Sequence, residues 1–325
     1  MHSLVTGGTG HIGNVLIRRL LETGDHVRVM VLPKDDLSPL VGLDVEIVLG
    51  DILNPATIRK AMQGVNRVFH LAGMISILPG DKPLLERINI QGTRNMLECA
   101  NQEGVQRFIY TSSIHALGNH PHGEVITELC GFDPQKSMGD YDKTKAEASL
   151  LALQAAQQGM DVVIVCPTGV IGPNDFRRSE MGTYLWNSSR SRLVIGVEGA
   201  YDFVDVRDVA DGILLAATHG ISGNTYILSG EQISIRNIVA EIKKSTGRQF
   251  SFLNIPKWLA FFSASFMPFV YRLVRQKPQF TPYSLTTVFS NSVVSHAKAT
   301  IELGYRPRRI SESIKDTLIW YEQNR

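Results

Sequence analysis

The feature that most constrains the fold is a repeated order of helix, glycine and strand in the first half of the chain. Four times an apolar-periodic segment ends on a glycine, at Gly24, Gly64, Gly104 and Gly159, and a run rich in Val, Ile or Phe follows within three residues. Glycine is the preferred residue for ending a helix in the left-handed conformation, and such apolar runs are typical of strands buried on both faces. The order therefore predicts an α/β fold in which helices cover both sides of a doubly wound parallel sheet.

A glycine-rich loop joins the first predicted strand, Ser3 to Thr6, to the first predicted helix, Asn14 to Glu22. The glycines between Gly7 and Gly13 satisfy both G-x-x-G-x-x-G and G-x-G-x-x-G. Missing side chains let the backbone turn tightly and approach a pyrophosphate, which the free N–H groups of the helix N-terminus stabilise. The pattern therefore predicts a Rossmann-type, dinucleotide-binding fold. The expected cofactor-binding residues of this loop are Gly7, Thr9, Gly10, His11, Ile12 and Gly13.

The chain of 325 residues is longer than one typical domain, and its regular order breaks in the second half. We predict that residues 1–170 form the dinucleotide-binding domain, to which residues 201–230 return. Residues 171–200 and 231–325 are expected to form a smaller, mostly helical C-terminal lobe that binds the substrate. The stretch 167–200 is rich in Gly, Ser, Asn and Arg, which is typical of loops that shape a site. Beyond residue 230 the sequence predicts helices without regular strands, at 234–246, 256–274, 296–303 and 311–321.

Composition restricts the partners of the chain. The net charge of +2 and the sequence pI of 8.4 give no case for nucleic acid, because Lys and Arg are scattered rather than gathered in a stripe. The three cysteines are far apart and lack the paired spacing of a metal site, which suits a reducing compartment. No charged-then-apolar leader opens the chain. We therefore expect a cytoplasmic homodimer that acts on a small molecule and uses no metal.

The segment 258–274 allows three interpretations. It is apolar and aromatic, but it also contains Pro268 and Arg272. A bilayer span needs about 20 apolar residues, which is more than this segment offers. We expect a helix that covers an apolar substrate pocket. The alternatives are a peripheral contact with a membrane surface and, least favoured, a true span.

Tyr141 and Lys145 are the residues in which we expect the chemistry to lie. They are four residues apart at the start of a run of good helix formers, so both side chains can point to one reactant. A phenol is a poor acid at neutral pH, because its pKa is about 10, and a nearby cation favours the phenolate. The pair therefore predicts proton transfer. The alternative is coincidence, since a chain with nine tyrosines can contain one Tyr-x-x-x-Lys by chance.

Polar residues follow other predicted strands at the edge where ligands of such sheets bind. Thr111, Ser112 and Ser113 end one of these strands, and a hydroxyl there can donate to a carbonyl oxygen. The alternative is that Ser and Thr merely end the strand. Asp51 follows the strand Val45 to Leu49, where it is placed to meet an adenine amine or, alternatively, to cap the next helix.

The end of the second predicted strand bears on the form of the dinucleotide. An acid that selects NAD is expected there, but the chain has Val31-Leu32-Pro33. No arginine is present at this place either, and Lys34 is the residue that could reach a 2′-phosphate. The sequence therefore favours NADP slightly over NAD.

Together these motifs resemble the extended short-chain dehydrogenase/reductase family, which includes NAD-dependent epimerases and dehydratases. Within the family the chain is most similar to the dihydroflavonol-4-reductase and 3β-hydroxysteroid dehydrogenase branch, because of the Arg28-Val29 strand, the isoleucine after Thr-Ser-Ser and the aromatic segment after Pro256. The segments that carry the family resemblance, in order along the chain, are Gly7–Gly13, Gly50-Asp51-Ile52, His70-Leu71-Ala72-Gly73, Asn89-Ile90-Gln91-Gly92-Thr93, Tyr110-Thr111-Ser112-Ser113, Tyr141-Asp142-Lys143-Thr144-Lys145, Pro167 to Pro173, Phe203 to Ala210 and Leu303 to Pro307.

The resemblance implies a role for each matching residue. Tyr141 would be the general acid/base, Lys145 would lower its pKa and bind the nicotinamide ribose, and Ser113, aligned by its spacing to Gly118, would bind the substrate oxygen. Hydride would pass between the substrate carbon and the nicotinamide. For Asn89 a capping role is the alternative to cofactor binding. The further residues that would bind the cofactor are Asp51, Ile52, Leu71, Ala72, Gly73, Asn89, Thr111, Tyr141, Lys145, Pro167, Thr168, Gly169 and Val170.

Two residues depart from the family pattern. Leu32 stands where reductases of this branch often carry a phosphate-binding arginine, which weakens the prediction of NADP. Cys166 replaces an arginine that is common before this proline, and we assign no chemistry to it.

The sequence leaves three functions open. The favoured one is an NAD(P)-dependent oxidoreductase that transfers hydride to or from a hydroxyl or carbonyl carbon of a fairly apolar, steroid- or flavonoid-like substrate. A nucleotide-sugar epimerase would reuse Tyr141 and Lys145, although an apolar second lobe argues against a diphosphate substrate. Dehydration is disfavoured, because Ser113-Ile114-His115 lacks the acidic pair of the family's dehydratases. A non-catalytic dinucleotide sensor is least favoured, because the tyrosine–lysine pair is intact.

Overall fold

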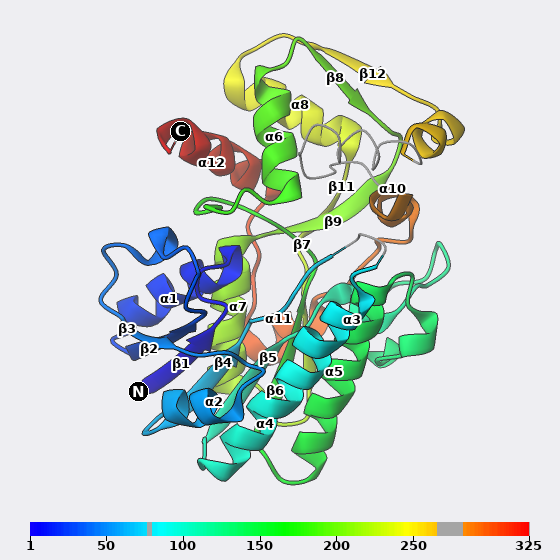
Figure 1. Ribbon diagram of the computed structural model, residues 1–325. Helices are drawn as coiled ribbons and strands as arrows, with labels where there is room; N and C mark the ends of the chain where they lie inside the picture. Colours follow the sequence, from blue (N-terminus) through cyan, green and yellow to red (C-terminus); the bar gives the residue numbers. More distant parts are fainter. Residues whose placement is uncertain (77–79, 265–281, 325) are drawn as a thin grey trace.

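The computed structural model describes residues 1–76, 80–264 and 282–324. In these parts the chain forms a larger lobe, built on a seven-stranded sheet, and a smaller lobe that contains the C-terminus (Figure 1). The N-terminus lies in the larger lobe. The two lobes face one another across the edge at which several strands of the large sheet end, so this edge is where a site can form.

The main sheet is parallel throughout, with the strand order β3-β2-β1-β4-β5-β6-β10. Successive connections reverse direction between β1 and β4, which is where a doubly wound sheet opens a crevice for a ligand. The predicted α/β class is confirmed. The strands are β1 (His2–Thr6), β2 (His26–Val31), β3 (Glu46–Leu49), β4 (Arg67–His70), β5 (Arg107–Thr111), β6 (Val162–Pro167) and β10 (Thr225–Leu228).

Helices cover both faces of this sheet, with α1, α7 and α11 on one face and α2, α4 and α5 on the other (Figure 1). Val68 and Phe69, neighbours on β4, are both fully buried but pack into opposite cores, because successive strand residues point to opposite faces. A short helix α3 and a π-helical segment lead into α4. The bounds are α1 (His11–Glu22), α2 (Pro55–Met62), α3 (Lys82–Leu85), the π-helical segment (Glu86–Gln91), α4 (Gly92–Gln102), α5 (Asp140–Gln157), α7 (Val206–His219) and α11 (Ala297–Leu303).

The four glycines that the sequence singled out adopt the backbone conformation expected of them. Their φ angles are +79° at Gly24, +71° at Gly64, +68° at Gly104 and +99° at Gly159. A residue with a Cβ is strained in this region, so glycine stops the helix and lets the chain turn into the next strand. This local requirement explains why the order of elements in the larger lobe could be predicted.

The smaller lobe contains strands that the sequence did not predict. β9 pairs with β7 and β11, and β12 pairs with β8, so the predictions of loops in 167–200 and of helices without regular strands beyond residue 230 were wrong. Four of these strands have only three or four residues, too few for an alternating pattern to be recognised. The elements are β7 (Gly169–Ile171), β8 (Leu193–Gly196), β9 (Ala200–Asp205), β11 (Glu231–Ser234), β12 (Ser251–Asn254), α6 (Glu180–Arg190), α8 (Ile235–Thr246), α10 (Pro282–Phe289) and α12 (Ile310–Gln323).

The helices predicted at 234–246, 296–303 and 311–321 are confirmed as α8, α11 and α12. However, α11 packs against α7 and β10 of the larger lobe, and Tyr305, which follows it, is buried in the core on that side. The C-terminal part of the chain therefore contributes to both lobes.

The aromatic segment predicted at 258–274 is described only as far as residue 264, and its remainder lies outside the described residues. Residues 257–264 are helical, and the side chains of Trp258 and Phe262 are 70% and 61% exposed. Among the described residues, no helix combines the length and the apolar character needed to cross a membrane.

Candidate active site

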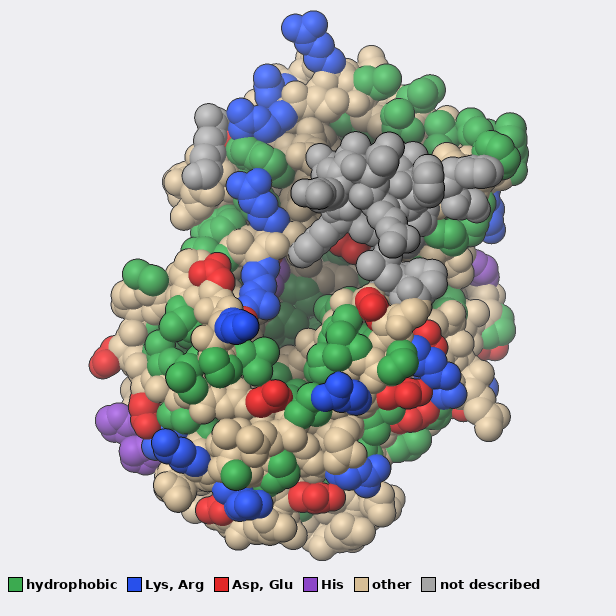
Figure 2. Space-filling model, viewed as in Figure 1, with side chains coloured by type: hydrophobic (Ala, Val, Ile, Leu, Met, Phe, Trp, Pro, Cys, Tyr) green, Lys and Arg blue, Asp and Glu red, His purple; other side chains and the backbone are tan. Residues whose placement is uncertain are grey.

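A cavity of about 580 Å³ lies where the carboxyl ends of β1, β4, β5 and β6 face the smaller lobe. Figure 2 shows the hollow between the two lobes, with apolar side chains in its depth. Both lobes contribute to its walls: the glycine loop and the end of β5 from the larger lobe, and α6, β9 and α10 from the smaller one. This is the edge at which the sequence predicted the ligand.

The glycine loop forms one side of the cavity, and its packing excludes larger residues. Gly7 has a φ of +74°, and a Cβ on it would lie 2.7 Å from the backbone nitrogen of Ala72. A Cβ on Gly13 would lie 2.2 Å from the carbonyl oxygen of Gly7, so the first turn of α1 rests directly on the loop. α1 starts after Gly10 without a side-chain cap in the described structure, which leaves its first N–H groups available to an anion.

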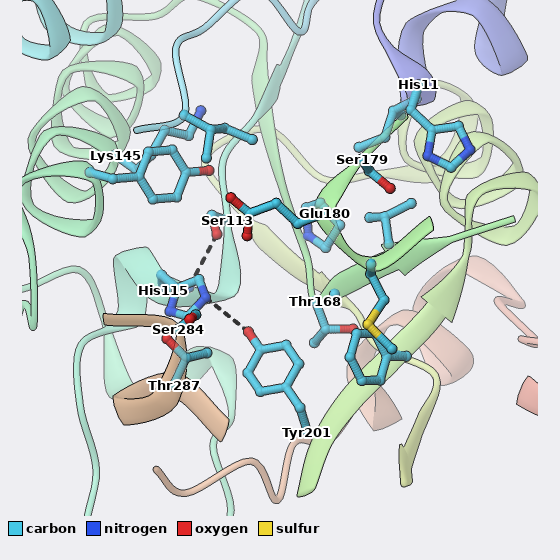
Figure 3. A pocket seen from close by; sticks show the side chains of 18 of the residues that line it. His11, Ser113, His115, Lys145, Thr168, Ser179, Glu180, Tyr201, Ser284 and Thr287 are labelled. Atoms are coloured by element: carbon cyan, nitrogen blue, oxygen red, sulfur yellow. Dashed lines mark hydrogen bonds between the residues drawn. The ribbon is translucent and has the colours of Figure 1, made fainter. Parts of the chain in front are cut away.

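Ser113 and Tyr141 meet in this cavity. Ser113 follows β5 in an extended conformation and caps the short helix Ile114–Leu117, while Tyr141 lies in the first turn of α5. Both side chains line the cavity, the Ser113 hydroxyl is close enough to lower the pKa of the Tyr141 phenol, and Figure 3 shows Ser113 in the wall of the cavity. The structure thus brings together the Ser113 hydroxyl, expected from the resemblance to bind the substrate oxygen, and the Tyr141 phenol, expected to be the general acid/base. The neighbouring Ser112 hydroxyl is instead 2.6 Å from the Ser149 hydroxyl on α5.

Lys145 lies one turn further along α5, with only 6% of it exposed. Its ammonium donates a hydrogen bond to the Thr111 carbonyl oxygen at 2.7 Å and lies 4.5 Å from the centre of the Tyr110 ring. Burial lowers the pKa of Lys145 to about 7. The cation is therefore directed at the end of β5, and part of its charge is lost at neutral pH.

The pKa of Tyr141 moves in the direction opposite to the one expected from the sequence. Burial raises the pKa of Tyr141 to about 12, and the nearby Ser113 hydroxyl opposes this rise. The expected lowering by Lys145 is not seen, because burial has the largest effect on the phenol and burial also leaves the lysine partly neutral at neutral pH. The Tyr141 phenol is consequently protonated at neutral pH, ready to donate a proton.

The residues around the cavity fit a nicotinamide dinucleotide. Thr111 lines the cavity, and its buried hydroxyl oxygen has no hydrogen-bond partner among the described residues. Buried hydroxyls nearly always have a partner, so this one is suited to a bound polar group. At the glycine loop, the start of α1 offers N–H groups that can bind a pyrophosphate.

Most of the cofactor-binding residues predicted from the sequence line this cavity: Gly7, Gly10, His11, Ile12, Gly13, Leu71, Gly73, Thr111, Tyr141, Lys145, Pro167, Thr168, Gly169 and Val170. The Thr168 hydroxyl, however, donates to Asp202 Oδ1 at 2.6 Å and so serves the protein itself. Ile52 is buried in the core against α4, and the Ala72 N–H donates to the Thr6 hydroxyl at 3.2 Å. The predicted residues that do not line the cavity are Thr9, Lys34, Asp51, Ile52, Ala72 and Asn89.

Asn89 lies outside the cavity and forms hydrogen bonds with two segments that line it. It lies in the π-helical segment, where its Oδ1 accepts a hydrogen bond from the Met74 backbone nitrogen at 2.8 Å. Its Nδ2 donates to the Met74 carbonyl oxygen at 3.0 Å and to the Thr144 hydroxyl at 3.0 Å. These bonds join the segment after β4 to the helix that carries Tyr141 and Lys145. Asn89 is therefore a positioning residue rather than a helix cap.

Asp51 shapes a turn in the structure. Its Oδ1 accepts from the Leu53 backbone nitrogen at 2.9 Å. The cap of α2 is Asn54, whose Oδ1 accepts from the Ala56 nitrogen at 3.1 Å, so the alternative capping role for Asp51 is wrong. Its contact with adenine stays a prediction.

The sequence analysis missed two charged residues beside the glycine loop. Thr9 donates from its hydroxyl to Asp35 Oδ2 at 3.0 Å, and Arg177 donates to Asp35 Oδ1 at 2.7 Å and to the Thr9 hydroxyl oxygen at 2.6 Å. Arg177 belongs to the loop between β7 and α6, so this cluster joins the two lobes. No local pattern could reveal it, since Arg177 is 142 residues from Asp35.

A cluster of four polar residues lies beside Ser113, and the sequence analysis assigned no role to this cluster. Tyr201 and His115 are joined by a hydrogen bond of 2.9 Å, which Figure 3 shows, and the His115 Nδ1 lies 3.9 Å from Asp142 Oδ1. The Asp142 carboxylate also accepts a hydrogen bond from the Tyr283 hydroxyl. These four residues come from four separate elements, and their proximity is a product of the tertiary structure.

Comparison with known proteins places the chain in a family. The model of the NAD dependent epimerase/dehydratase family matches residues 3–229, which is more than half of the chain. The chain belongs to this family. The resemblance to extended short-chain dehydrogenase/reductases that its motifs indicated is thereby confirmed. This NAD dependent epimerase/dehydratase family member is an enzyme, and it carries the expected Rossmann fold.

Individual relatives lie on the branch indicated by the motifs. The family member is 35% identical to sterol demethylase protein B of Methylococcus capsulatus, over 99% of each chain. It is 34% identical to a putative dihydroflavonol 4-reductase of Synechocystis, over 98% of this chain and 94% of the other. The 3-beta-hydroxysteroid dehydrogenase of Mycolicibacterium neoaurum is 28% identical over 94% of this chain and 86% of its own.

Solved structures show the same architecture. The crystal structure of gox2253 superposes with a TM-score of 0.86 at 29% identity and covers 99% of this chain and 98% of the other. DesIV, a dTDP-glucose 4,6-dehydratase of Streptomyces venezuelae solved with NAD bound, has a TM-score of 0.80 at 23% identity, over 100% of this chain and 98% of its own. The latter likeness concerns the fold alone.

Proposed function

We propose that this family member is an NAD(P)-dependent oxidoreductase that reduces a carbonyl carbon of a fairly apolar, ring-bearing substrate, or oxidises the corresponding hydroxyl. The observation that carries the proposal is that Ser113, Tyr141 and Lys145 share one mostly apolar cavity with the glycine loop. Such a cavity holds the reacting oxygen, an acid/base and a dinucleotide site within one enclosed space.

The lining of the cavity supports an apolar substrate. Among the lining residues that the structure describes, Lys145 is the only Lys or Arg, and this favours an apolar substrate over one that carries a diphosphate of its own beside that of the dinucleotide. Apolar contact with a ring system is favourable by about 25 cal/mol per Å² of buried area. The names of the sterol- and flavonol-related relatives agree with this substrate class. The apolar and aromatic lining residues include Met74, Ile75, Met181, Tyr184, Val197, Phe203, Ile235, Leu285 and Val288.

The polar residues divide the chemistry between them. Ser113 would donate a hydrogen bond to the substrate oxygen and hold it beside Tyr141. Tyr141 would protonate that oxygen during reduction, which its protonated state at neutral pH favours. Lys145, next to both Thr111 and Tyr141, would hold the nicotinamide ribose. When bound, the nicotinamide cofactor supplies the hydride in this direction.

For the form of the cofactor we propose NADP, with a small preference over NAD. Lys34 is exposed on the segment after β2, and Arg177 is a second cation beside the glycine loop. A 2′-phosphate there would attract both cations, and Arg177 would exchange its bond with Asp35 for a bond with the phosphate. The Asp35 carboxylate would instead favour a free ribose hydroxyl, which keeps the preference small.

Cofactor oxidation in the presence of ketones tests the proposed reaction. The protein is incubated with NADPH or NADH and a panel of apolar ring ketones, and the nicotinamide absorbance is followed. Ketone-dependent oxidation of the cofactor is the expected result. Interconversion of UDP-sugars without net cofactor oxidation would replace the proposal with the epimerase alternative, and absence of both activities would reject the two.

A further inference from the structure

Apolar side chains are exposed on the outer face of the small sheet formed by β8 and β12. Leu193 and Ile195 stand on either side of the buried Val194 along β8, and they are 48% and 49% exposed. Leu253 of β12, which is paired with Ile195, is also 48% exposed. Successive strand residues point to opposite faces, and Val194 packs into the core of the smaller lobe. The three exposed residues therefore share the face that is turned away from that core.

The helix that follows β12 continues this apolar surface. It covers residues 257–264, and its exposed aromatic residues Trp258 and Phe262 are four residues apart, on one side of the helix. Figure 2 shows hydrophobic side chains gathered at the upper right of the molecule, where Figure 1 places β8, β12 and this helix. Single exposed apolar residues are common, whereas a gathered group usually marks a contact site. We call the following residues the apolar patch: Leu193, Ile195, Leu253, Trp258 and Phe262.

The charges of the segments that carry the apolar patch are all positive. Residues 191–197 and 247–264 contain Arg192, Arg248 and Lys257 but no Asp or Glu. The whole chain, in contrast, is nearly balanced, with 33 Lys and Arg against 31 Asp and Glu. Arg192 directly precedes Leu193, Lys257 directly precedes Trp258, and both cations are exposed. The apolar patch is therefore flanked by positive charge on both of its segments.

A bilayer with anionic lipids has the two properties that this surface complements. Apolar and aromatic side chains are favourable at the boundary between headgroups and acyl chains, where Trp is enriched, and neighbouring Lys or Arg attract acidic headgroups. A second copy of the chain fits less well. Contact between two apolar patches would bring Arg192 and Lys257 of both copies together, and like charges oppose such a contact. The charge pattern therefore favours a lipid surface.

The buried side of the same helix reaches the wall of the active-site cavity. Ala260 and Ala264 belong to one apolar cluster with Val197 and Leu285. Val197 and Leu285 also line the cavity. Residues 257–264 thus lie between the cavity wall on one side and the exposed apolar patch on the other.

We propose that the apolar patch and its flanking cations dock the protein on the surface of a bilayer that contains anionic lipids. The smaller lobe then faces the membrane, and the cavity lies one helix away from it. An apolar ring ketone dissolves in the bilayer and is concentrated near the cavity by this docking. That consequence rests on the proposed function, whereas the docking itself does not.

Sedimentation with lipid vesicles tests the docking. The full chain is mixed with vesicles of phosphatidylcholine, either alone or together with phosphatidylglycerol, and the bound fraction is measured. We expect binding to the mixed vesicles that weakens as salt is raised. Trp258→Ser should weaken it by more than about tenfold, because a large interfacial side chain is lost. Arg192→Gln and Lys257→Gln should each weaken it by about fivefold.

A matched pair of leucine variants separates the apolar patch from exposed apolar residues in general. Leu253→Ser removes an apolar side chain from the patch and should weaken binding to the mixed vesicles. Leu129→Ser makes the same change at a residue of the larger lobe that is 97% exposed, and binding should be unaltered. Equal effects of the two variants would contradict docking through the patch.

Lipids brominated on their acyl chains distinguish insertion from adsorption by charge alone. Bromine quenches the fluorescence of a Trp that reaches the acyl chains, so the wild type should be quenched. Trp258→Phe keeps an aromatic ring in the apolar patch together with Trp186 and Trp320, and it should still bind while the quenching is lost. Quenching that persists in Trp258→Phe would show that another surface meets the bilayer.

Two further outcomes would overturn the docking. One is a wild type that sediments with neither kind of vesicle. If that protein is also a dimer that Leu253→Ser dissociates, the apolar patch belongs to a second copy. The other is vesicle binding that neither Trp258→Ser nor Leu253→Ser weakens. Reduction of a water-soluble ring ketone should be unchanged in both variants, so failure of the docking and failure of the proposed function are seen in separate measurements.

Discussion

The Lys145 ammonium donates a hydrogen bond to the Thr111 carbonyl oxygen at 2.7 Å, which ties α5 to the end of β5 at the centre of the site. This bond directs the cation to the strand rather than to the neighbouring phenol. Tyr141 instead lies close to Ser113, whose hydroxyl lowers the pKa of the phenol. Tyr141 and Lys145 thus have different partners in the protein. Burial is the largest influence on both: it raises the pKa of Tyr141 and lowers the pKa of Lys145.

Replacing the phenol should separate chemistry from binding. We expect Tyr141→Phe to lower the rate of ketone reduction by about 10²–10⁴-fold, because the proton donor is lost. Cofactor affinity, measured by fluorescence titration, should stay close to that of the wild type, since the ring and the glycine loop are retained. Reduction at the wild-type rate would remove Tyr141 from the mechanism.

The buried lysine should make the stability of the protein depend on pH. The pKa of Lys145 is about 7 in the folded protein, whereas in the unfolded chain it is about 10.4. Between these values the unfolded chain binds more protons, so the free energy of unfolding contributed by this group rises with pH. We expect the melting temperature of the cofactor-free wild type to rise more steeply from about pH 7 to about pH 9 than that of Lys145→Met. Equal slopes in the two proteins would contradict the lowered pKa.

The cluster of Thr9, Asp35 and Arg177 should control the choice of cofactor. We expect Arg177→Ala to weaken NADPH binding by about tenfold, as for loss of a charge-assisted hydrogen bond, and NADH binding less. Lys34→Ala should act in the same direction but more weakly, because Lys34 is exposed. Asp35→Asn should improve NADPH binding relative to NADH. Dissociation constants for both cofactors measure these effects, and equal changes for the two would refute the preference for NADP.

Two glycine variants should distinguish close packing from backbone strain. A Cβ at Gly13 would lie 2.2 Å from the Gly7 carbonyl oxygen, so Gly13→Ala must displace the loop, and we expect it to lower cofactor affinity strongly. Gly24 has open space around it but a φ of +79°. Gly24→Ala should therefore lower the free energy of unfolding by about 1 kcal/mol and leave cofactor affinity unchanged. Unaltered affinity in Gly13→Ala would show that the loop does not need this close contact.

The residues that could be predicted from the sequence obey local rules. Gly24 and Gly104 mark helix ends because glycine adopts their positive φ angles without strain, and Tyr141 shares a helix face with Lys145 because of the helical period. The glycine loop was recognisable because a tight turn, a strand and a helix succeed one another within a few residues. The short strands β8 and β12 follow no such rule, since they pair with one another across more than 50 residues of sequence and pack into the core of the smaller lobe.

The sequence by itself determined the sheet, its helices and the positions of the main acid/base candidates, because these depend on backbone conformation and on periodicity along the chain. The tertiary structure alone decided that Tyr201 meets His115, that Arg177 reaches Asp35, and that the pKa of Tyr141 rises rather than falls. These outcomes depend on which distant segments are packed together and on how far water is excluded from them. Electrostatic interactions in a buried site depend on distance and desolvation, and neither quantity can be read from the order of residues in the chain.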